Sequence, residues 1–199
     1  MSTCKVAILI DGGFFLQRFK AIYARPPKIG DMQPFLDGIM NKVDTTTPTG
    51  ITNVLLRSFY YDCRPFGDKK SHPDGSVVDF SQQGQFKAAT AFQNNLKLFP
   101  QLALRLGDLS FDGWKVDKSD RTRYYPDFKQ KTVDMKIGLD IAWMSGKHII
   151  DKLVLVAGDS DFVAPMKFAR REGILVYLYP MQQSHIKILL KEHADYVLM

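Results

Sequence analysis

The sequence predicts an α/β fold with a mostly parallel sheet. Five runs rich in apolar and β-branched residues alternate along the chain with segments whose apolar residues recur at helical spacing. Two of these runs, 6–10 and 153–157, are apolar at every position, as expected of parallel strands that are covered on both faces. The length of 199 residues suits one hydrophobic core, so we expect a single domain over residues 1–199.

In the first half of the chain, the strand at 5–10 is followed closely by two glycines, which favour a tight turn. A helix comes next and stops before the pair Pro26 and Pro27, because the residue before a proline disfavours helical geometry. A polar segment with several Gly and Pro residues follows the second strand and is expected to be a surface excursion. In order, we expect a helix ending near residue 24, a helix at 32–43, a strand at 51–61 and the polar excursion at about 62–81.

The second half repeats the alternation of helix and strand around a second polar stretch. Its most apolar strand, 153–157, runs directly into the sequence GDSD and a helix. Apolar residues at helical spacing also predict a helix that Thr132 opens and Gly146 closes. In order, we expect a helix at 82–98, a strand at 102–106, a polar excursion at about 110–131, a helix at 132–146, the strand at 153–157, a helix ending near 171, a strand at 174–179, a helix at 184–193 and a short edge strand at 196–198.

Two of the clearest strands end in acidic residues. Asp11 follows the first strand, and Asp159 and Asp161 follow the fourth. In open parallel sheets, ligands bind beyond the carboxyl ends of the strands, and Asp134, in the first turn of its helix, can reach the same crevice. Carboxylates gathered in this way repel one another, so some would stay protonated unless a cation joined them. Oxygen ligands of this type suit Mg²⁺ or Mn²⁺, and the sequence therefore predicts a divalent metal site at these aspartates.

Most of these acids also have a structural explanation. Aspartate is a favoured N-cap, which would account for Asp159 or Asp161. An acid in the first turn of a helix is stabilised by the helix dipole, which would account for Asp134. Asp140 is a further candidate ligand, but it lies four residues after Lys136, and an ordinary ion pair explains it about as well.

Several residues near the acids are candidates for contacting a substrate. Asp11 precedes Gly12 and Gly13, where the backbone can approach a phosphate or a metal closely, and no helix cap is needed to explain this aspartate. Lys131 could hold a phosphate or could simply be solvated. Ser160 offers a further oxygen between two acids, for capping or for a substrate.

The polar excursion at about 110–131 mixes arginines with aromatic residues, as proteins that bind single-stranded nucleic acid do. It contains Trp114, Arg121, Arg123, Tyr124 and Tyr125. We expect Arg121, Arg123 and Tyr124 to guide RNA to the acidic crevice. The alternative is that the aromatic residues pack within their own loop.

Composition and motifs limit the classes of protein that fit. The formal net charge of +6 favours a polyanionic partner, although solubility alone also explains it. Cys4 and Cys63 lie far apart, as expected of reduced thiols in a cytoplasmic protein, and the N-terminal apolar run is too short for a signal sequence or a membrane span. The four histidines lack zinc-binding spacing, and no phosphate-binding glycine loop or nucleophile elbow is present. We therefore expect a cytoplasmic protein with no membrane partner. The sequence is also compatible with a homo-oligomer.

Four segments resemble the NYN domain, a branch of the PIN-like nucleases, and in particular its LabA-like members. The segments are VAILIDGGFF at 6–15, RSFYYD at 57–62, KTVDMKIGLD at 131–140 and LVLVAGDSDFVAPMKFARREG at 153–173. The resemblance covers most of the chain and is loose between residues 62 and 130. It implies a Rossmann-like three-layer α/β/α sandwich of the PIN-like type, with strand order 3-2-1-4-5. It also implies an acidic site for divalent metal and, for many relatives, RNA cleavage.

The resemblance also assigns roles to particular acids. The family's acidic positions fall on Asp11, Asp134, Asp159 and Asp161, with Asp140 as a further position. The family commonly has an asparagine soon after its first aspartate, whereas this chain has Gly12, Gly13 and Phe14 there. This departure concerns how substrate or a metal-bound water is held on the Asp11 side.

Together these features predict a metal-dependent endoribonuclease that hydrolyses phosphodiester bonds of RNA, with single-stranded RNA as the substrate. One alternative is a weak or inactive NYN domain that binds RNA or protein. Another is a different Mg²⁺-dependent phosphate hydrolase. The metal dependence of RNA cleavage separates the three.

Overall fold

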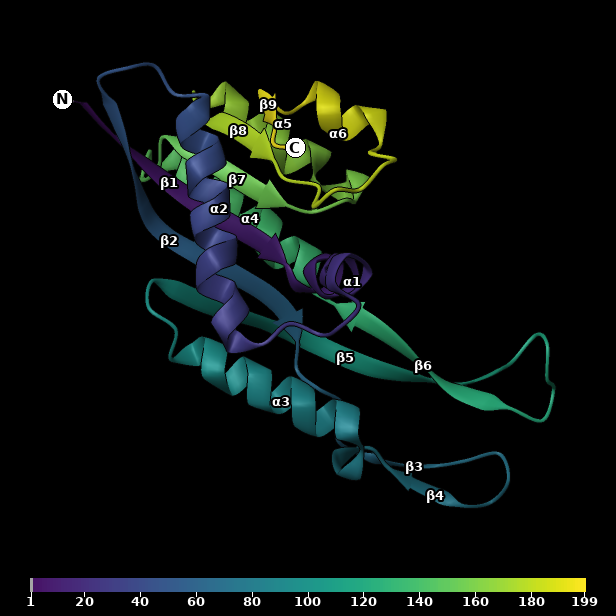
Figure 1. Cartoon of the computed structure of the whole chain (residues 1–199). Helices are drawn as coiled ribbons and strands as arrows, with labels where there is room; N and C mark the ends of the chain where they lie inside the picture. Colours follow the sequence, from purple (N-terminus) through teal and green to yellow (C-terminus); the bar gives the residue numbers. More distant parts are fainter. Residues whose placement is uncertain (1) are drawn as a thin grey trace.

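The computed structural model describes residues 2–199 as a central sheet of seven strands with helices on both faces (Figure 1). The strands of this sheet lie in the order β6-β5-β2-β1-β7-β8-β9, and each neighbouring pair is parallel except β5 and β6. They span β1 (Ser2–Asp11), β2 (Ile51–Cys63), β5 (Leu102–Val116), β6 (Tyr124–Lys131), β7 (Lys152–Val156), β8 (Leu175–Leu178) and β9 (Tyr196–Val197). The five strands expected from the sequence lie in the order β5-β2-β1-β7-β8, so the α/β fold and the order 3-2-1-4-5 are confirmed.

The helices form one layer on each face of the sheet. They are α1 (Gly12–Tyr23), α2 (Met32–Thr45), α3 (Gly84–Lys97), α4 (Val133–Gly146), α5 (Val163–Arg171) and α6 (Ile188–Glu192), with 3₁₀ turns at Ile29–Asp31, Phe80–Gln82 and Ser160–Phe162. One apolar core lies between the sheet and α1, α2 and α3, and a second lies between the sheet and α4, α5 and α6. Within residues 2–199, none of the helices has the length and apolar composition needed to span a membrane.

β1 is the central strand, and its side chains alternate between the two cores. Val6, Ile8 and Ile10 face the core under α1 and α2, whereas Ala7 and Leu9 face the core under α4 and α5. All five side chains are fully buried, which explains why this run is apolar at every position. β1 pairs with β2 on one side and with β7 on the other, so the carboxyl ends of these three strands lie side by side.

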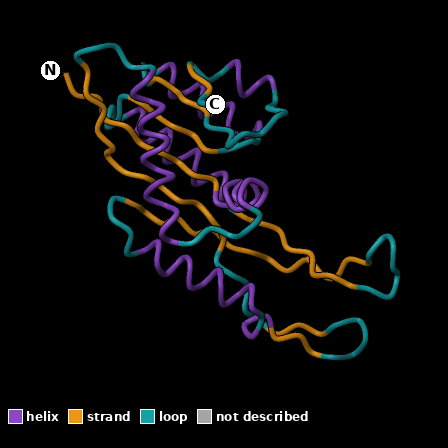
Figure 2. The backbone as a smooth tube through the Cα atoms, viewed as in Figure 1, coloured by secondary structure: helices purple, strands orange, loops and turns teal. Residues whose placement is uncertain are grey.

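The segment at 110–131 is a long hairpin and not the polar excursion predicted from the sequence. β5 continues past residue 106, where we expected it to end, and the chain returns along it as the antiparallel strand β6. The segment at 62–81 contains a second hairpin, in which β3 (Lys69–Ser71) pairs with β4 (Val77–Asp79). Both hairpins project from the same end of the molecule, and we call them the two arms (Figure 1; Figure 2).

An aromatic cluster holds the two arms together. Phe80 is buried, and its ring centroid lies 5.4 Å from that of Phe128, 5.5 Å from that of Phe66 and 6.0 Å from that of Trp114. The Trp114 indole N–H donates a hydrogen bond of 2.8 Å to the Ser71 carbonyl, which ties the β5–β6 arm to β3. Trp114 is therefore a packing residue, as the alternative interpretation predicted, but most of its contacts are to the other arm and not to its own loop.

The loop before the last helix is longer than predicted. The helix expected at 184–193 is reduced to α6, which covers only 188–192. In the preceding loop, Met181 and Gln182 have positive φ angles of 48° and 56°, which end any regular structure after β8. The short edge strand expected at 196–198 is present as β9.

A candidate acidic site at the carboxyl edge of the sheet

Three of the predicted aspartates line one pocket at the carboxyl ends of β1 and β7. Asp11 ends β1, Asp159 follows β7, and Asp134 lies in the first turn of α4. Asp161 does not line the pocket but lies near enough for its charge to act on Asp134. The pocket has a volume of about 430 Å³ and is lined by Asp11, Gly13, Phe14, Gln17, Arg18, Gln130, Asp134, Gly158, Asp159 and Gln183.

Asp11 joins the end of β1 to the start of α1. Its carboxylate accepts a hydrogen bond of 3.2 Å from the Phe14 backbone N–H and so caps the helix. The expectation that no cap would be needed here was wrong, because α1 begins directly after Asp11. Burial raises the pKa of Asp11 to about 6; the charges of Asp134 and Asp62 act in the same direction, and the hydrogen bond from Phe14 opposes them.

Asp134 reaches the pocket because the β5–β6 arm returns the chain to the carboxyl edge of the sheet before α4 begins. Thr132, between β6 and α4, has a φ of 70°, a left-handed conformation that is uncommon for a β-branched residue. This sharp turn puts the first turn of α4 at the pocket wall. Burial raises the pKa of Asp134, and the charges of Asp159 and Asp161 raise it further.

Asp159 is partly neutralised by a lysine that the sequence did not indicate. The Lys187 ammonium lies 3.2 Å from Asp159 Oδ1 and 3.1 Å from Ser160 Oγ. Asp159 Oδ1 also accepts the Asp161 backbone N–H at 3.3 Å, so it caps the following 3₁₀ turn, as its structural explanation predicted. Burial raises the pKa of Asp159, but these hydrogen bonds and the charge of Lys187 outweigh burial and lower the pKa below its usual value.

Asp62, at the carboxyl end of β2, is a further carboxylate beside the pocket. The β1–β2 ladder pairs Asp11 with Tyr61, so Asp62 lies one position further along the neighbouring strand. Its carboxylate accepts a hydrogen bond of 3.0 Å from Gln93 Nε2, and burial raises its pKa. Like Asp11, it comes at the end of a predicted strand, but we interpreted it as the start of a polar excursion.

A comparison with known families places this fold and site in context. The sequence profile of the NYN domain matches residues 57–199. The chain belongs to the NYN family. This family is part of the PIN-like superfamily and has the PIN-like nuclease fold. The match does not assign the chain to a branch within the family. The matched residues include Asp134, Asp159 and Asp161 and leave Asp11 outside.

Comparisons with individual proteins add little to the family assignment. No curated protein matches the sequence. Among solved structures, the crystal structure of a protein of unknown function from Vibrio parahaemolyticus is similar to this NYN domain, with a TM-score of 0.49 and 16% sequence identity. The similarity covers 98% of this chain and 91% of that chain.

The pocket of the NYN domain fits a hydrated divalent cation better than a closed metal cage. Among residues 2–199, no three His, Cys, Asp or Glu side chains lie close enough to enclose a metal ion. Mg²⁺ keeps several of its waters and is commonly held through only one or two carboxylates. Asp11, Asp134 and Asp159 offer carboxylates to one cavity, so a cation there would be held partly through water.

Asp140 and Lys131 are among the predicted site residues that do not line the pocket. Asp140 accepts hydrogen bonds from the Tyr61 hydroxyl at 2.8 Å and from Arg105 Nε at 3.2 Å. Lys136, the partner we expected for it, donates instead to a backbone carbonyl of β5. Asp140 is thus explained by a hydrogen-bond network between α4 and the sheet. Lys131, the last residue of β6, is exposed and does not line the pocket.

Arg121, Arg123 and Tyr124 lie at the tip of the β5–β6 arm. β6 has eight residues, so its two ends are about 20 Å apart, and only its far end reaches the pocket, through Gln130. The Tyr124 ring packs against His72 of the other arm, with centroids 5.6 Å apart. These residues therefore lie apart from the acids and can contact only RNA that extends well beyond the pocket.

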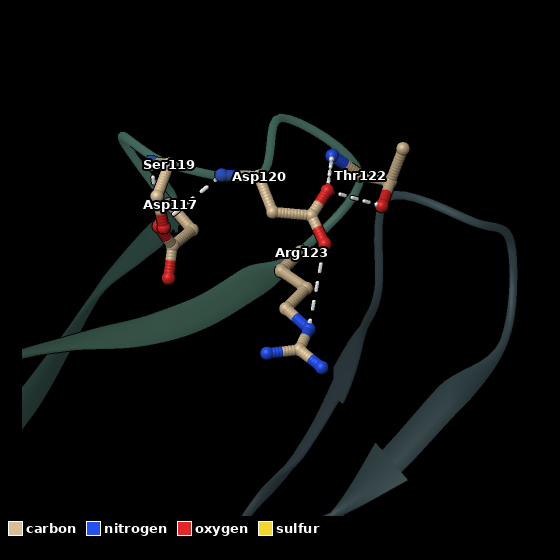
Figure 3. Close-up of polar contacts among 5 residues, drawn as sticks. All are labelled: Asp117, Ser119, Asp120, Thr122 and Arg123. Atoms are coloured by element: carbon tan, nitrogen blue, oxygen red, sulfur yellow. Dashed lines mark hydrogen bonds and ion pairs between the residues drawn. The ribbon is translucent and has the colours of Figure 1, made fainter.

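The tip of the β5–β6 arm is ordered by its own acids (Figure 3). Asp120 accepts hydrogen bonds from the backbone N–H and the hydroxyl of Thr122, and it forms an ion pair of 3.5 Å with Arg123. Asp117 accepts in the same way from the backbone N–H and the hydroxyl of Ser119. Arg123, one of the two arginines that we expect to guide RNA, is therefore already paired with a carboxylate.

Several polar residues that line the pocket or contact its acids were not predicted from the sequence. They come from α1, the end of β6 and the loop before α6, and they are Gln17, Arg18, Gln130, Gln183 and Lys187. None lies in a recognisable motif, and Gln130 lies at the end of a strand that the sequence did not predict. Only the packing of these three segments around the carboxyl edge of the sheet brings them to the acids.

Gly12 and Gly13, both predicted to contact substrate, occupy different environments. A Cβ at Gly12 would lie 2.5 Å from the Tyr61 backbone oxygen, whereas a Cβ at Gly13 would meet Gln130 Nε2 at 3.3 Å. We expect Gly12→Ala to lower the free energy of unfolding by about 2 kcal/mol through overpacking of α1 against β2. We expect Gly13→Ala to change it by less than about 1 kcal/mol, since alanine favours the helix and the Gln130 side chain can move. Urea denaturation measures both; equal effects would contradict a packing role for Gly12.

The raised pKa of Asp11 predicts a pH dependence of the stability of the metal-free protein. The pKa of about 6 in the folded protein exceeds the usual 3.8, so the folded state holds the proton more tightly and stability falls as the pH rises between these values. Asp11→Asn removes this effect and keeps the cap. We expect Asp11→Asn to match the parent near pH 4 and to exceed its stability by roughly 3 kcal/mol at pH 7. Thermal denaturation in EDTA tests this, and a difference independent of pH would count against it.

Proposed function

We propose that this NYN domain is a metal-dependent ribonuclease that cleaves single-stranded RNA at the pocket of Asp11, Asp134 and Asp159. The observation that carries the proposal is the convergence of these three carboxylates on one pocket at the carboxyl edge of a parallel sheet. Stability does not explain the arrangement, because the pKa values of Asp11 and Asp134 are raised and their ionised forms oppose folding. Carboxyl groups with perturbed pKa values in a cleft are typical of functional sites.

In the proposed reaction the chain's own residues bind the ion and move a proton. Mg²⁺ or Mn²⁺ would supply charge that stabilises the phosphorane and activates water. Asp11, Asp134 and Asp159 would hold the ion, with Asp161 contributing charge at its edge. The carboxylate of Asp11, whose pKa burial raises to about 6 in the metal-free protein, would accept a proton from the attacking water. The water oxygen bonds to phosphorus while the bond to the 3′ oxygen breaks and that oxygen takes up a proton, which leaves a 5′ phosphate and a 3′ hydroxyl.

Single-stranded RNA is the proposed substrate because a single strand can enter a recessed pocket that a duplex cannot. The net charge of +6 favours a polyanion through counterion release. Tyr125, which is 45% exposed near the tip of the β5–β6 arm, offers a stacking surface to a strand that extends past the pocket.

Incubation of the pure protein with labelled RNA and DNA in Mn²⁺, Mg²⁺ or EDTA tests this function. We expect RNA to be cut in Mn²⁺ or Mg²⁺, to stay intact in EDTA, and to yield fragments with a 5′ phosphate. Cleavage that persists in EDTA, or intact RNA with every metal, would overturn the proposal.

A second candidate function is RNA binding without cleavage. It is favoured by the spacing of the acids, because within residues 2–199 no three His, Cys, Asp or Glu side chains lie close enough together to enclose a metal ion. It is also favoured by the ion pair that already neutralises Asp159. RNA that is bound but never cut, whatever the metal, would establish this function in place of the nuclease.

A further inference from the structure

We propose that Lys187 binds the phosphate group of the RNA at the edge of the acidic pocket and that Arg18 positions the loop that carries it. The inference rests on the proposed function of the pocket, which it extends by naming the group that receives the substrate's charge. Lys187 lies in none of the segments that carry the resemblance to the family.

The acidic pocket needs a cation on the protein to receive a phosphodiester. Asp11, Asp134 and Asp159 all present negative charge to it, and a phosphate entering beside them is repelled unless positive charge lies nearby. Arg18 is the cationic side chain among the residues that line the pocket, and Lys187 lies beside the pocket, where it contacts Asp159.

The contacts of Lys187 leave it able to bind an anion. Its ammonium has three N–H donors, and the hydrogen bonds to Asp159 Oδ1 and Ser160 Oγ use two of them. The side chain is 56% exposed, so the remaining donor is accessible from solvent. Lysine binds phosphate as a point charge and needs no fixed approach geometry, which suits a flexible single-stranded backbone.

The Arg18 guanidinium is already hydrogen-bonded within the protein, and Arg18 therefore acts as a positioning residue. Its Nε and Nη2 donate hydrogen bonds of 3.1 and 3.0 Å to the Met181 carbonyl, in the loop between β8 and α6. Met181 is buried and, like Gln182, has a positive φ, a strained conformation that persists only where the surroundings enforce it. The loop is thus fastened at Met181 by a buried side chain and by Arg18.

The fastened loop reaches the acidic pocket at two points. Gln183 lines the pocket, and its Oε1 is buried without a hydrogen-bond partner among residues 2–199. A Cβ at Gly158 would lie 2.8 Å from that oxygen, so the loop packs closely against the end of β7. Lys187 follows four residues later, and its place beside Asp159 is therefore set by the loop.

Because Lys187 is paired with Asp159, loss of its ammonium is expected to have different effects on the affinity for RNA and on the affinity for Mn²⁺. Removing the ammonium removes a partner for phosphate, so the affinity for RNA falls. It also frees the Asp159 carboxylate from a competing cation, so the affinity for Mn²⁺ stays equal or rises. A residue with only a structural role would weaken both together.

Lys187→Ala, with Lys191→Ala as the matched control, tests the assignment. Lys191 is exposed and lies one turn further along, in α6, so it reports the loss of one surface charge. In EDTA, where no cleavage is expected, we expect Lys187→Ala to weaken binding of a short labelled RNA about fivefold and to reduce the slope of log Kd against log salt by about 0.7. Lys191→Ala should change Kd by less than about twofold, and Lys187→Arg should retain the parent's affinity.

Two further measurements complete the test. Calorimetric titration with Mn²⁺ should give Lys187→Ala an affinity equal to that of the parent or up to about tenfold higher. Arg18→Ala should reproduce the loss of RNA affinity, because the loop is no longer held. Equal RNA binding by Lys187→Ala and Lys191→Ala, or weaker Mn²⁺ binding by Lys187→Ala, would overturn the assignment.

The outcomes separate this assignment from the nuclease proposal. If the parent cuts no RNA with any metal and Lys187→Ala still loses RNA affinity, the nuclease proposal fails and the phosphate site stands. If the parent cuts RNA and Lys187→Ala binds and cuts it like the parent, the nuclease proposal stands and the phosphate site fails.

Discussion

Asp159→Asn is expected to reduce RNA cleavage by at least about 100-fold, which corresponds to about 3 kcal/mol in the transition state. Asparagine can still accept the Asp161 backbone N–H, so the 3₁₀ turn keeps its cap and only the charge is lost. Asp11→Asn is expected to cause a loss of similar size. Because Lys187 offsets the charge of Asp159 in the metal-free protein, Asp159→Asn should change metal-free stability by less than about 1 kcal/mol.

Thermal denaturation with and without Mn²⁺ separates a metal ligand from a helix cap at these positions. Added Mn²⁺ should raise the Tm of the parent, by mass action on the folded state, and should do much less for Asp159→Asn or Asp11→Asn. Asp37→Asn is the matched control, since Asp37 accepts only an exposed hydrogen bond from Gln33 on α2. This control should retain both cleavage and the response to Mn²⁺. Full RNA cleavage by both site variants would reject the metal-site proposal.

Phe80→Ala is expected to destabilise the two arms by about 3 kcal/mol, within the range found for buried phenylalanines. Phe80, which directly follows β4, is only 3% exposed and contacts Phe111, Trp114 and Phe128 of the β5–β6 arm and Phe66 just before β3. The arms lie outside the two main cores, so the loss should appear as local opening. Amide hydrogen exchange in β3 and β4 should become about 100-fold faster, while exchange in β1 should change little.

Val77→Ala provides the comparison for Phe80→Ala within the same arm. Val77 is 64% exposed in β4, and its truncation should alter stability by no more than about 0.5 kcal/mol. Equal exchange rates in the two variants would show that the aromatic cluster does not hold the arms together.

The sequence predicted the central sheet well and the two arms poorly, for one physical reason. β1 and β7 are covered on both faces, and their continuous apolar runs are hard to confuse with loops. The strands of the β5–β6 arm are largely exposed, and Phe111 and Phe128 are separated by polar residues and glycine, as in a loop. The order of the strands came from the family resemblance, because periodicity alone does not fix which strands are neighbours.

The candidate site likewise contains residues that the sequence predicted and residues that only tertiary packing brings to it. Asp11 and Asp159 were found because each follows a strand whose end is clear in the sequence. Asp134 needed the arm to return the chain to the carboxyl edge, which no local pattern predicted. Lys187 is a single lysine in an irregular loop, and nothing in its neighbours distinguishes it from the other surface lysines. Tertiary packing alone makes it part of the site.

The central position of β1 also bears on how the molecule is made. β1 is synthesised well before its partner β7, with which it pairs through contacts such as Val6 with Lys152. Pairings so far apart in sequence form slowly, and until then the apolar edge of β1 is open to other chains. Asp11 and Asp159 cannot meet before this step. A chain that has not yet been extended past β7 therefore carries no assembled acidic pocket, and whatever this pocket does begins only after β7 and the residues that follow it have been synthesised.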